Sequence, residues 1–231
     1  MTPPIDTVGV VVPARDESEL LPLALVALDD AVTAARRRGV QVDLVVVADS
    51  CADDTAAVAR AHGVRVLEVE LGAVGPARAI GLRDILDRYP LVPRDRLWLA
   101  TTDADSRVPK DWIVAQVDLA ASGADLVLGT VEVDDWTGHP PYVEAAWRAG
   151  YDHRDGHGHV HGANVGTRAD AYEAVGGFPA LELDEDVALV AALAHRRVVR
   201  TGAIPVLTSA RATARAQGGF AEFLGGLRSA V

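Results

Sequence analysis

Three runs of consecutive apolar residues punctuate the first hundred positions of the chain. They occupy residues 7–14, 42–49 and 97–103, are rich in valine or leucine, and stop at a proline or an aspartate. Continuous apolar runs, rather than alternating ones, are typical of strands that are buried on both faces, as in a parallel sheet covered by helices. We therefore predict three buried strands at these positions.

Segments with apolar residues at helical spacing separate these strands. The first covers residues 18–39, with Ser18 as a possible N-cap and Gly39 as the stop signal. Strand and helix thus alternate, which predicts an α/β fold with a mostly parallel central sheet flanked by helices. The remaining elements predicted in this half are helices at 53–63 and 75–89 and a strand at 64–70.

The second half of the chain is less regular. A Trp-, His- and Gly-rich stretch at 134–167 lacks a clear period, and we expect it to form loops over the sheet. We find neither an internal repeat nor a Pro/Ser-rich linker, so residues 1–231 are predicted to form one domain. The elements predicted around the irregular stretch are helices at 109–123, 168–175 and 185–196 and strands at 124–133 and 203–210.

Composition and charge exclude several classes of protein. The 231 residues are 49% hydrophobic and 24% charged, which is enough to build a core. A net charge of −11 disfavours nonspecific binding to nucleic acid or anionic lipid. The single cysteine, Cys51, excludes an internal disulfide or a cysteine-built zinc site. We expect a cytoplasmic protein, because signal-peptide features and an apolar run long enough to span a bilayer are both lacking.

Acidic residues follow the predicted strands at the places where ligands bind in open α/β sheets, beyond the carboxyl ends of the strands. Glu17 follows the first strand, Asp49 the second, and Asp103 and Asp105 the one at 97–103. In extended chain, residues i and i+2 point the same way, so Asp103 and Asp105 can present oxygens to one Mg²⁺ or Mn²⁺ ion. A turn in which Asp103 caps the strand end is the alternative explanation.

Other polar groups leave their roles open. His153, His157, His159 and His161 alternate along one loop and could bind a transition metal, but a polar loop is favoured because neither a cysteine nor a helical H-x-x-x-H accompanies them. Asp53 is more typical of a helix cap than of a ligand. Arg211 and Arg215 could grip a diphosphate, although a surface position is favoured.

Six segments occur in an order that is typical of one family. "VVVPARDE" resembles an opening strand with a P-x-x-N-E segment, and "VVVADSCADDT" resembles a D-x-S-x-D-x-T motif with one extra residue. "GAVGPARAIGL" is similar to a G-x-x-x-A-R-N-x-G segment, and "TTDADSRVPKDWI" to a metal motif followed by P-x-W. "GANVGTRADAYEAVGGFP" and "LDEDVALVAAL" resemble an acceptor segment with a GGF turn and a glutamate-aspartate motif. Over roughly residues 7–200 the chain thus resembles glycosyltransferase family 2, the nucleotide-sugar transferases with the A-type glycosyltransferase fold.

The resemblance implies a metal-dependent, inverting glycosyltransferase that moves a sugar from a nucleotide-diphosphate donor, UDP-sugar favoured, to a hydroxyl of a small-molecule or lipid acceptor. It implies a nucleotide-binding half at about 7–105, an acceptor-binding half at about 106–210 and a tail at about 211–231. The cofactor would be Mn²⁺ or Mg²⁺. The implied nucleotide-binding residues are Pro13, Arg15, Glu17, Asp49, Arg78 and Asp103; the metal ligands are Asp103 and Asp105; the catalytic residues are Asp186 as base and Glu185 beside it; and the acceptor-side residues are His161, Asn164 and Trp136.

Alternatives remain beside this interpretation. Acids in the first turn of a helix are favoured by the helix dipole, which explains Asp184, Glu185 and Asp186 without catalysis. A sugar-nucleotide-binding protein without turnover would keep the same fold. A nucleotidyltransferase is disfavoured, because "PARDE" follows the first strand where such enzymes carry a glycine-rich basic loop.

Overall fold

The predicted strands come together in one mixed sheet. A computed structural model describes residues 2–133, 135–181 and 183–211 of the chain. Within these ranges the sheet has the order β3-β2-β1-β4-β7-β6-β8-β5. The strands are β1 (Thr7–Ala14), β2 (Gln41–Asp49), β3 (Arg65–Val69), β4 (Leu97–Thr101), β5 (Ser106–Arg107), β6 (Leu126–Val133), β7 (Val165–Arg168) and β8 (Val198–Thr208).

The prediction of a mostly parallel sheet needs correction. Strands β3, β2, β1 and β4 are parallel neighbours, and β6 is parallel to β8. However, β7 is antiparallel to both β4 and β6, and β5 is antiparallel to β8. Both reversed strands are too short to stand out as apolar runs, because β7 is the four residues VGTR and β5 the two residues SR.

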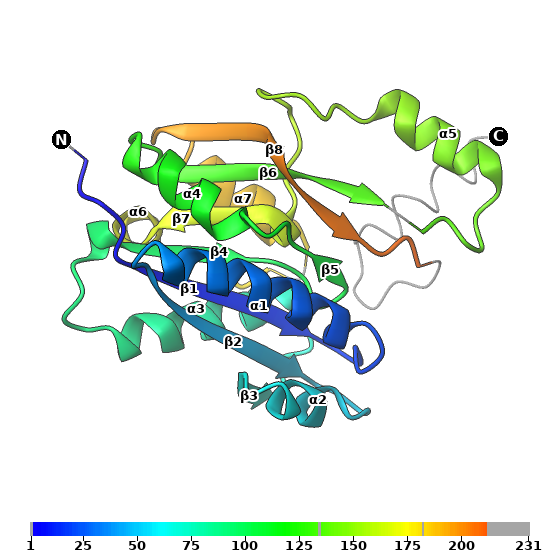
Figure 1. The fold of residues 1–231 in the computed structure, drawn as a ribbon, viewed down its shortest axis with the longest axis horizontal. Helices are drawn as coiled ribbons and strands as arrows, with labels where there is room; N and C mark the ends of the chain where they lie inside the picture. The colour runs from blue at the N-terminus through cyan, green and yellow to red at the C-terminus, as the bar shows by residue number, and fades with distance from the viewer. Residues whose placement is uncertain (1, 134, 182, 212–231) are drawn as a thin grey trace.

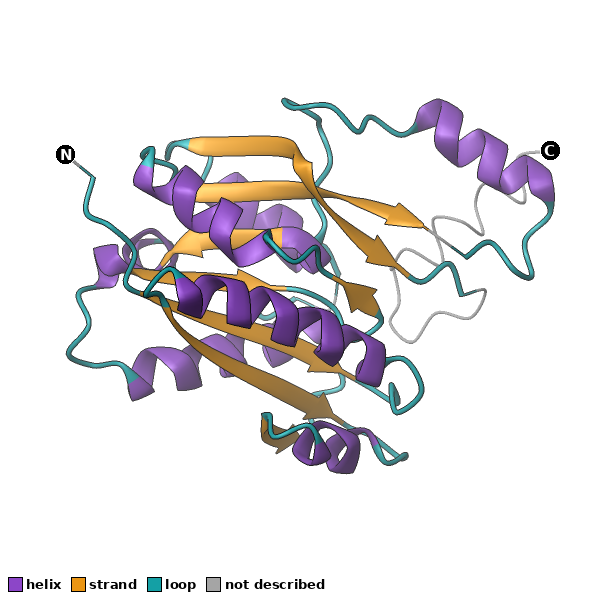
Figure 2. Cartoon of the chain, in the orientation of Figure 1, coloured by secondary structure: helices purple, strands orange, loops and turns teal. Residues whose placement is uncertain are grey.

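Helices cover both faces of the sheet (Figures 1 and 2). Period-two alternation divides the strand side chains between the faces, so Val8, Val10 and Val12 pack on one side while Val11 packs on the other. The first face is covered by α1 (Leu21–Arg37), α2 (Thr55–Ala61) and α4 (Trp112–Ala121), and the second by α3 (Val74–Arg88), α6 (Ala169–Ala174) and α7 (Glu185–Ala192).

A further helix lies in the stretch that we expected to be irregular. Helix α5 (Pro141–Gly150) is drawn beyond the ends of β6 and β8, away from the two main layers (Figure 1). Its Val143 and Trp147 form a separate small core with Val131 and Val133 at the end of β6. The helix was missed because a Trp-, His- and Gly-rich composition hides its short apolar face.

Several predicted boundaries shift. Ser18 does not cap the first helix, because the carbonyl of Glu17 accepts the N–H groups of Leu20 and Leu21 and the helix begins only after that turn. Gly39 does end it, in a left-handed conformation with φ of 79°. Strand β8 begins at Val198 rather than at 203. Of the predicted tail at 211–231, all but the first residue, including Arg215, lies outside the described residues.

Asn164 ties the two halves of the sheet together. It lies in a single 3₁₀ turn, η2 (Gly162–Asn164), and is 1% exposed. Its side-chain oxygen accepts the indole N–H of Trp112 at 2.8 Å, and its amide nitrogen donates to the carbonyls of Thr130 and Ile204, each at 2.8 Å. These bonds join α4, β6 and β8 at one buried point.

Replacing Asn164 with alanine should therefore destabilise the fold. The change leaves a buried indole N–H and two buried carbonyls without partners, so we expect Asn164→Ala to lower the free energy of unfolding by about 3 kcal/mol. Urea denaturation followed by circular dichroism measures this value. The control is Gln41→Ala, which removes an exposed amide bonded to Tyr89 and should cost less than about 1 kcal/mol. Equal losses in the two variants would contradict the structural role of Asn164.

Candidate active site

The acidic residues predicted from the sequence meet at one edge of the sheet. Strands β2, β1 and β4 are parallel neighbours, with Ala14 of β1 opposite Ala48 of β2 and Val11 of β1 opposite Thr101 of β4. Their carboxyl ends therefore lie together, where Asp49 is the last residue of β2 and Glu17 and Asp103 lie just beyond the ends of β1 and β4. Such convergence is the feature that makes this edge a candidate active site.

A buried arginine pairs with two of the predicted site acids. Arg78 of α3 donates to the carboxylate of Asp103 at 2.6 Å and to that of Glu185 at the start of α7. The side chains of Arg78 and Glu185 are each only 5% exposed, whereas that of Asp103 is 35% exposed. Removing three charged groups from water is costly unless they compensate one another, as they do here.

Burial and charge oppose each other at this cluster. Burial lowers the pKa of Arg78, but the charges of Asp103 and Glu185 outweigh it and leave that pKa above its usual value. Burial also raises the pKa of Glu185 above its usual value, against the opposing effect of the Arg78 charge. The guanidinium lies against the backbone of Gly162, where an added Cβ would come within 2.4 Å of Arg78 Cζ. Only glycine fits beneath this arginine.

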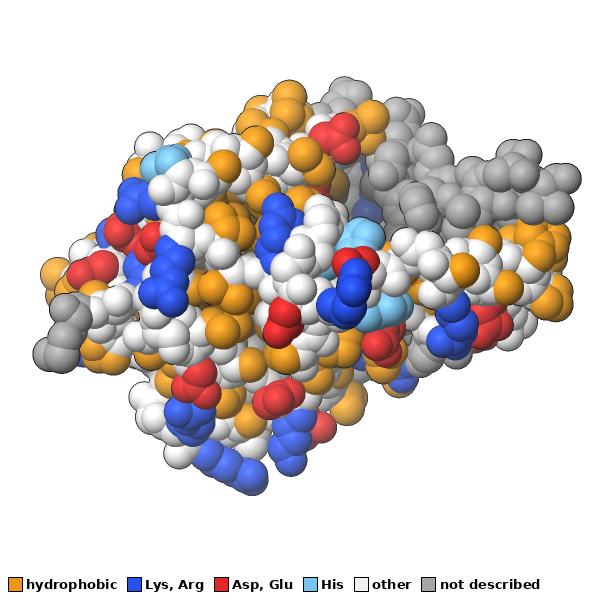
Figure 3. All heavy atoms as spheres, turned by 90° about the horizontal axis from the view of Figure 1, so that it is seen from above, with side chains coloured by type: hydrophobic (Ala, Val, Ile, Leu, Met, Phe, Trp, Pro, Cys, Tyr) orange, Lys and Arg blue, Asp and Glu red, His pale blue; other side chains and the backbone are white. Residues whose placement is uncertain are grey.

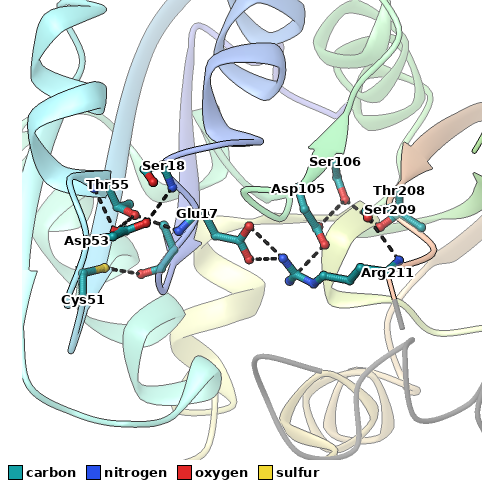
Figure 4. A network of polar contacts seen from close by, with 11 residues as sticks. Glu17, Ser18, Cys51, Asp53, Thr55, Asp105, Ser106, Thr208, Ser209 and Arg211 are labelled. Atoms are coloured by element: carbon teal, nitrogen blue, oxygen red, sulfur yellow. Dashed lines mark hydrogen bonds and ion pairs between the residues drawn. The ribbon is translucent and has the colours of Figure 1, made fainter. Parts of the chain in front are cut away.

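A second arginine joins two further acids (Figure 4). Arg211, just beyond β8, has its Nη1 atom 2.6 Å from Glu17 Oε1 and its Nη2 atom 3.1 Å from Asp105 Oδ2. Burial raises the pKa of Asp105 above its usual value, the Arg211 charge opposes that rise and the Asp103 charge adds to it. Arg211 was favoured as a surface residue from the sequence. The pairing of β5 with β8, which brings it to the site, has no signal in the local pattern.

Asp103 and Asp105 lie in a turn rather than in extended chain. The carbonyl of Asp103 accepts the N–H of Ser106 at 3.1 Å, and the two carboxylates bind different arginines. The geometric reason we gave for a shared orientation is thus wrong, and the turn that was its alternative is present. Because the Asp103 charge affects the pKa of Asp105, the two carboxylates are nevertheless electrostatically coupled.

Asp49 organises the loop in front of α3. Its carboxylate accepts the backbone N–H groups of Leu71 at 2.6 Å, Gly72 at 3.0 Å and Ala73 at 3.0 Å, and the hydroxyl of Ser50 at 3.0 Å. With Asp49 only 4% exposed, these bonds hold the loop firmly against the end of β2. The predicted contact of Asp49 with a nucleobase stays a prediction.

The three acids at the start of α7 differ in their surroundings. Glu185 is buried in the Arg78 pair, and Asp184 is exposed in a left-handed conformation with φ of 57°. Asp186 is half-buried, and its Oδ2 atom accepts the N–H of Gly162 at 2.7 Å. The Gly162 carbonyl in turn accepts the hydroxyl of Thr101 at 2.7 Å, which connects Asp186 to the end of β4.

The histidine loop forms an aromatic stack around Tyr151. The ring of His159 lies 4.0 Å from that of Tyr151 with an interplanar angle of 2°, and the Tyr151 hydroxyl lies 2.8 Å from His161 Nε2. Because this hydroxyl accepts the N–H of Val131 at 2.9 Å, its own proton is available to His161. Burial, reinforced by the charges of His159 and His157, lowers the pKa of His161 to about 4. His161 is therefore neutral near pH 7.

Across the described part of the chain, one group of three or more His, Cys, Asp or Glu residues has ligand atoms within 4.8 Å of one another, and it contains no histidine. This group is Asp16, Cys51 and Asp53, beside an open depression of about 340 Å³. Asp16 accepts the N–H of Ala52 at 2.7 Å, and Asp53 accepts those of Ser18 at 3.0 Å and Thr55 at 2.9 Å. These bonds join the loops after β1 and β2. The N-cap residue of α2 is Asp54 rather than Asp53, so the predicted cap is wrong by one residue, although Asp53 does bond the N–H of Thr55, the first residue of the helix.

The remaining predicted residues are dispersed. Pro13 is buried in β1, and Arg15 is exposed just after it. Trp136 is half-buried and meets His139 edge to face at 5.8 Å between ring centroids. The side-chain amide of Asn164 makes the framework hydrogen bonds described above. This geometry therefore does not support its predicted contact with an acceptor substrate. Arg168, seven residues after His161, is likewise buried and donates to backbone carbonyls including that of Asp95 at 2.5 Å.

Three solved structures illustrate the fold that this chain shares with known proteins. S. aureus TarS 1–349 in complex with UDP has a TM-score of 0.63 at 14% identity, over 89% of this chain and 61% of that chain. Mannosyltransferase PcManGT from Pyrobaculum calidifontis, in complex with GDP-Man and Mn²⁺, has a TM-score of 0.64 at 18% identity, over 94% and 61%. Glucosyl-3-phosphoglycerate synthase from Mycobacterium tuberculosis, with Mg²⁺ and UDP, has a TM-score of 0.54 at 15% identity, over 96% and 75%.

These likenesses establish the A-type glycosyltransferase fold, although the chain spans only about three fifths of TarS and of the mannosyltransferase. No curated protein sequence matches the chain. None of the helices in the described ranges is both long and apolar enough to cross a membrane. Residues 9–167, well over half of the chain, match the model of glycosyl transferase family 2. The chain therefore belongs to glycosyl transferase family 2.

Proposed function

We propose that this protein is a metal-dependent, inverting glycosyltransferase that moves a sugar from a nucleotide-diphosphate donor to a hydroxyl of a small-molecule or lipid acceptor. The observation that carries the proposal is the convergence of Glu17, Asp103 and Asp105 with Asp186 at one edge of the sheet, joined through Arg78, Arg211 and Gly162. Membership of the family supports it. We favour a UDP-sugar as donor, and two of the three solved structures named above hold UDP.

The donor would lie across the ends of β1, β2 and β4. Glu17 would accept a hydrogen bond from a ribose hydroxyl, and Pro13 and Arg15 would line the nucleoside pocket. Asp49 would act at the base, through the loop that it holds or by direct contact. Arg78, fixed between Asp103 and Glu185, would add positive charge near the leaving diphosphate.

Asp103 and Asp105 fit a divalent cation. Carboxylate oxygens are the ligands that Mg²⁺ and Mn²⁺ prefer, and substrate phosphate oxygens commonly complete the shell. The structure offers a test of that fit, because the largely buried carboxylate of Asp105 already pairs with a positive charge, that of Arg211. A bound Mn²⁺ or Mg²⁺ ion would supply Lewis-acid stabilisation of the departing diphosphate.

Asp186 is the proposed general base. It is half-buried, and its Oδ2 atom already accepts the N–H of Gly162, which orients the carboxylate. A single carboxylate that takes the acceptor proton while the hydroxyl attacks opposite the leaving diphosphate gives inversion at the anomeric carbon. His161, neutral at pH 7 and adjacent to Gly162, would face the acceptor, with Trp136 further out.

Surface charge disfavours a polyanionic partner. The face in Figure 3 mixes acidic, basic, histidine and hydrophobic side chains, and its described residues form no continuous basic patch. With a net charge of −11, binding to a nucleic-acid backbone is disfavoured.

Nucleotide binding should depend on metal and on Asp103. We expect Mn²⁺ to tighten the binding of UDP to the wild type by about tenfold or more, and the Asp103→Ala variant to lose that effect. Calorimetry with UDP, GDP, CDP, ADP and dTDP, with and without Mn²⁺ or Mg²⁺, identifies the nucleotide. Asp118→Ala, which removes an exposed partner of Arg38, is the control and should bind like the wild type. Failure of all five nucleotides to bind would contradict the transferase proposal.

Turnover should depend on Asp186 but nucleotide binding should not. Asparagine keeps the hydrogen bond from Gly162 but cannot take a proton, so Asp186→Asn should reduce hydrolysis or transfer of the bound sugar by about 10²–10⁴-fold. The nucleotide affinity should stay within about twofold of the wild type. Asp184→Asn is the matched control, because its residue is exposed and asparagine tolerates its positive φ. Retained turnover in Asp186→Asn would mean that the base lies elsewhere, and binding without any turnover in the wild type would favour a sugar-nucleotide-binding protein.

A further inference from the structure

We propose that the guanidinium of Arg211 and a divalent cation compete for Asp105, and that this competition couples metal binding to nucleoside binding. This inference rests on the proposed function, since it takes Asp105 as a metal ligand and Glu17 as a ribose ligand. One guanidinium bridges both carboxylates, with contacts of 2.6 Å to Glu17 and 3.1 Å to Asp105 (Figure 4). Either ligand must therefore break part of the same bridge.

The fold places Arg211 there through a short pair of strands. Ser106 of β5 lies opposite Thr208 of β8, and the Ser106 hydroxyl bonds that of Thr208 at 3.0 Å. Ser106 directly follows Asp105, and Arg211 comes three residues after Thr208. The N–H of Arg211 is held by the Ser209 hydroxyl at 3.2 Å. The arginine is thus delivered to Asp105 by backbone pairing rather than by chance contact on the surface.

Electrostatic repulsion prevents Arg211 and a divalent cation from binding the same oxygens of Asp105 at the same time. The side chain of Asp105 is 12% exposed and that of Glu17 is 6% exposed, so each carboxylate needs a positive or donor group next to it. A divalent ion and a guanidinium cannot share the same Asp105 oxygens, because like charges at such a distance repel strongly outside bulk water. A cation that takes the Oδ2 atom of Asp105 displaces Arg211 from it, and the contact of the same guanidinium with Glu17 is broken as well.

The exposure of the two site arginines supports replacement of Arg211 by a bound cation, and does not support replacement of Arg78. The side chain of Arg211 is 25% exposed and follows the end of an edge pairing, whereas that of Arg78 is 5% exposed inside α3. Displaced Arg211 can keep its charge solvated, while Arg78 is enclosed and stays next to Glu185 even when Asp103 is taken. The first ligand to bind, cation or nucleoside, must break the Arg211 bridge and so binds more weakly. The second ligand finds the bridge already broken and binds more tightly, which is positive coupling.

The first test is the binding of Mn²⁺ alone, measured by calorimetry or electron paramagnetic resonance. Arg211→Gln removes the competing charge and should bind Mn²⁺ about tenfold more tightly than the wild type. Arg211→Lys keeps a charge and should stay nearer to the wild type. Arg38→Gln, which removes an exposed bidentate pair with Asp118 away from the site, should leave Mn²⁺ binding unchanged. Thermal melting of each variant confirms that it is folded.

The second test isolates the coupling. Uridine and guanosine carry the ribose but no phosphate, so they cannot share the coordination shell of the ion. In the wild type, saturating Mn²⁺ should tighten binding of one of these nucleosides about fivefold or more, and in Arg211→Gln the effect should vanish.

The outcomes separate this inference from the proposed function. If Arg211→Gln binds Mn²⁺ no better than the wild type, or loses Mn²⁺–UDP binding, Arg211 is not a displaced occupant and the inference is wrong while the transferase proposal stands. If the wild type binds neither Mn²⁺ nor any of the five nucleotides, the proposed function fails and takes this inference with it.

Discussion

The candidate site depends on positive charges that neutralise the carboxylates which the sheet brings close together. Parallel strands deliver their following residues to one edge, and in this chain those residues include Glu17, Asp103 and Asp105. Two unit charges 4 Å apart interact by about 4 kcal/mol at an effective dielectric constant of 20, so uncompensated acids at this edge would oppose folding. Arg78 and Arg211 supply the compensating charge. The two arginines are therefore as much a part of this edge of the fold as the acids that they neutralise.

The backbone carries much of the remaining organisation. Gly162 donates its N–H to Asp186, accepts the Thr101 hydroxyl and leaves room for the Arg78 guanidinium, so one residue without a side chain connects the ends of β4, α3 and α7. Asp49 likewise acts through three backbone N–H groups of the loop before α3. Asp49 and Asp186 are thus held by peptide groups, which orient them without the entropy loss of a long flexible partner.

The sequence predicted the elements whose signal is local. The strands with long apolar runs, the helices between them and the acids that follow β1, β2 and β4 are where the pattern put them. It could not predict contacts created by strand order. Asn164 directly precedes the reversed strand β7 and bonds the carbonyls of Thr130 and Ile204, and Arg168 at the end of β7 bonds that of Asp95, so both are framework residues. Arg211 was undervalued for the same reason, because the two-residue β5 that positions it leaves no periodic trace.

The two arginines that compensate the acids differ in how firmly the fold holds them. Arg78 is enclosed between Asp103 and Glu185, so its charge is a fixed part of the fold and stays in place when substrate arrives. Arg211 reaches Asp105 from the end of a strand and remains partly in water, so its charge can be exchanged for another. A site with only enclosed arginines would have no place for a cation, and one with only exposed arginines would lose charge compensation whenever they moved. Dividing the compensation between a buried helix residue and a strand-end residue satisfies both requirements.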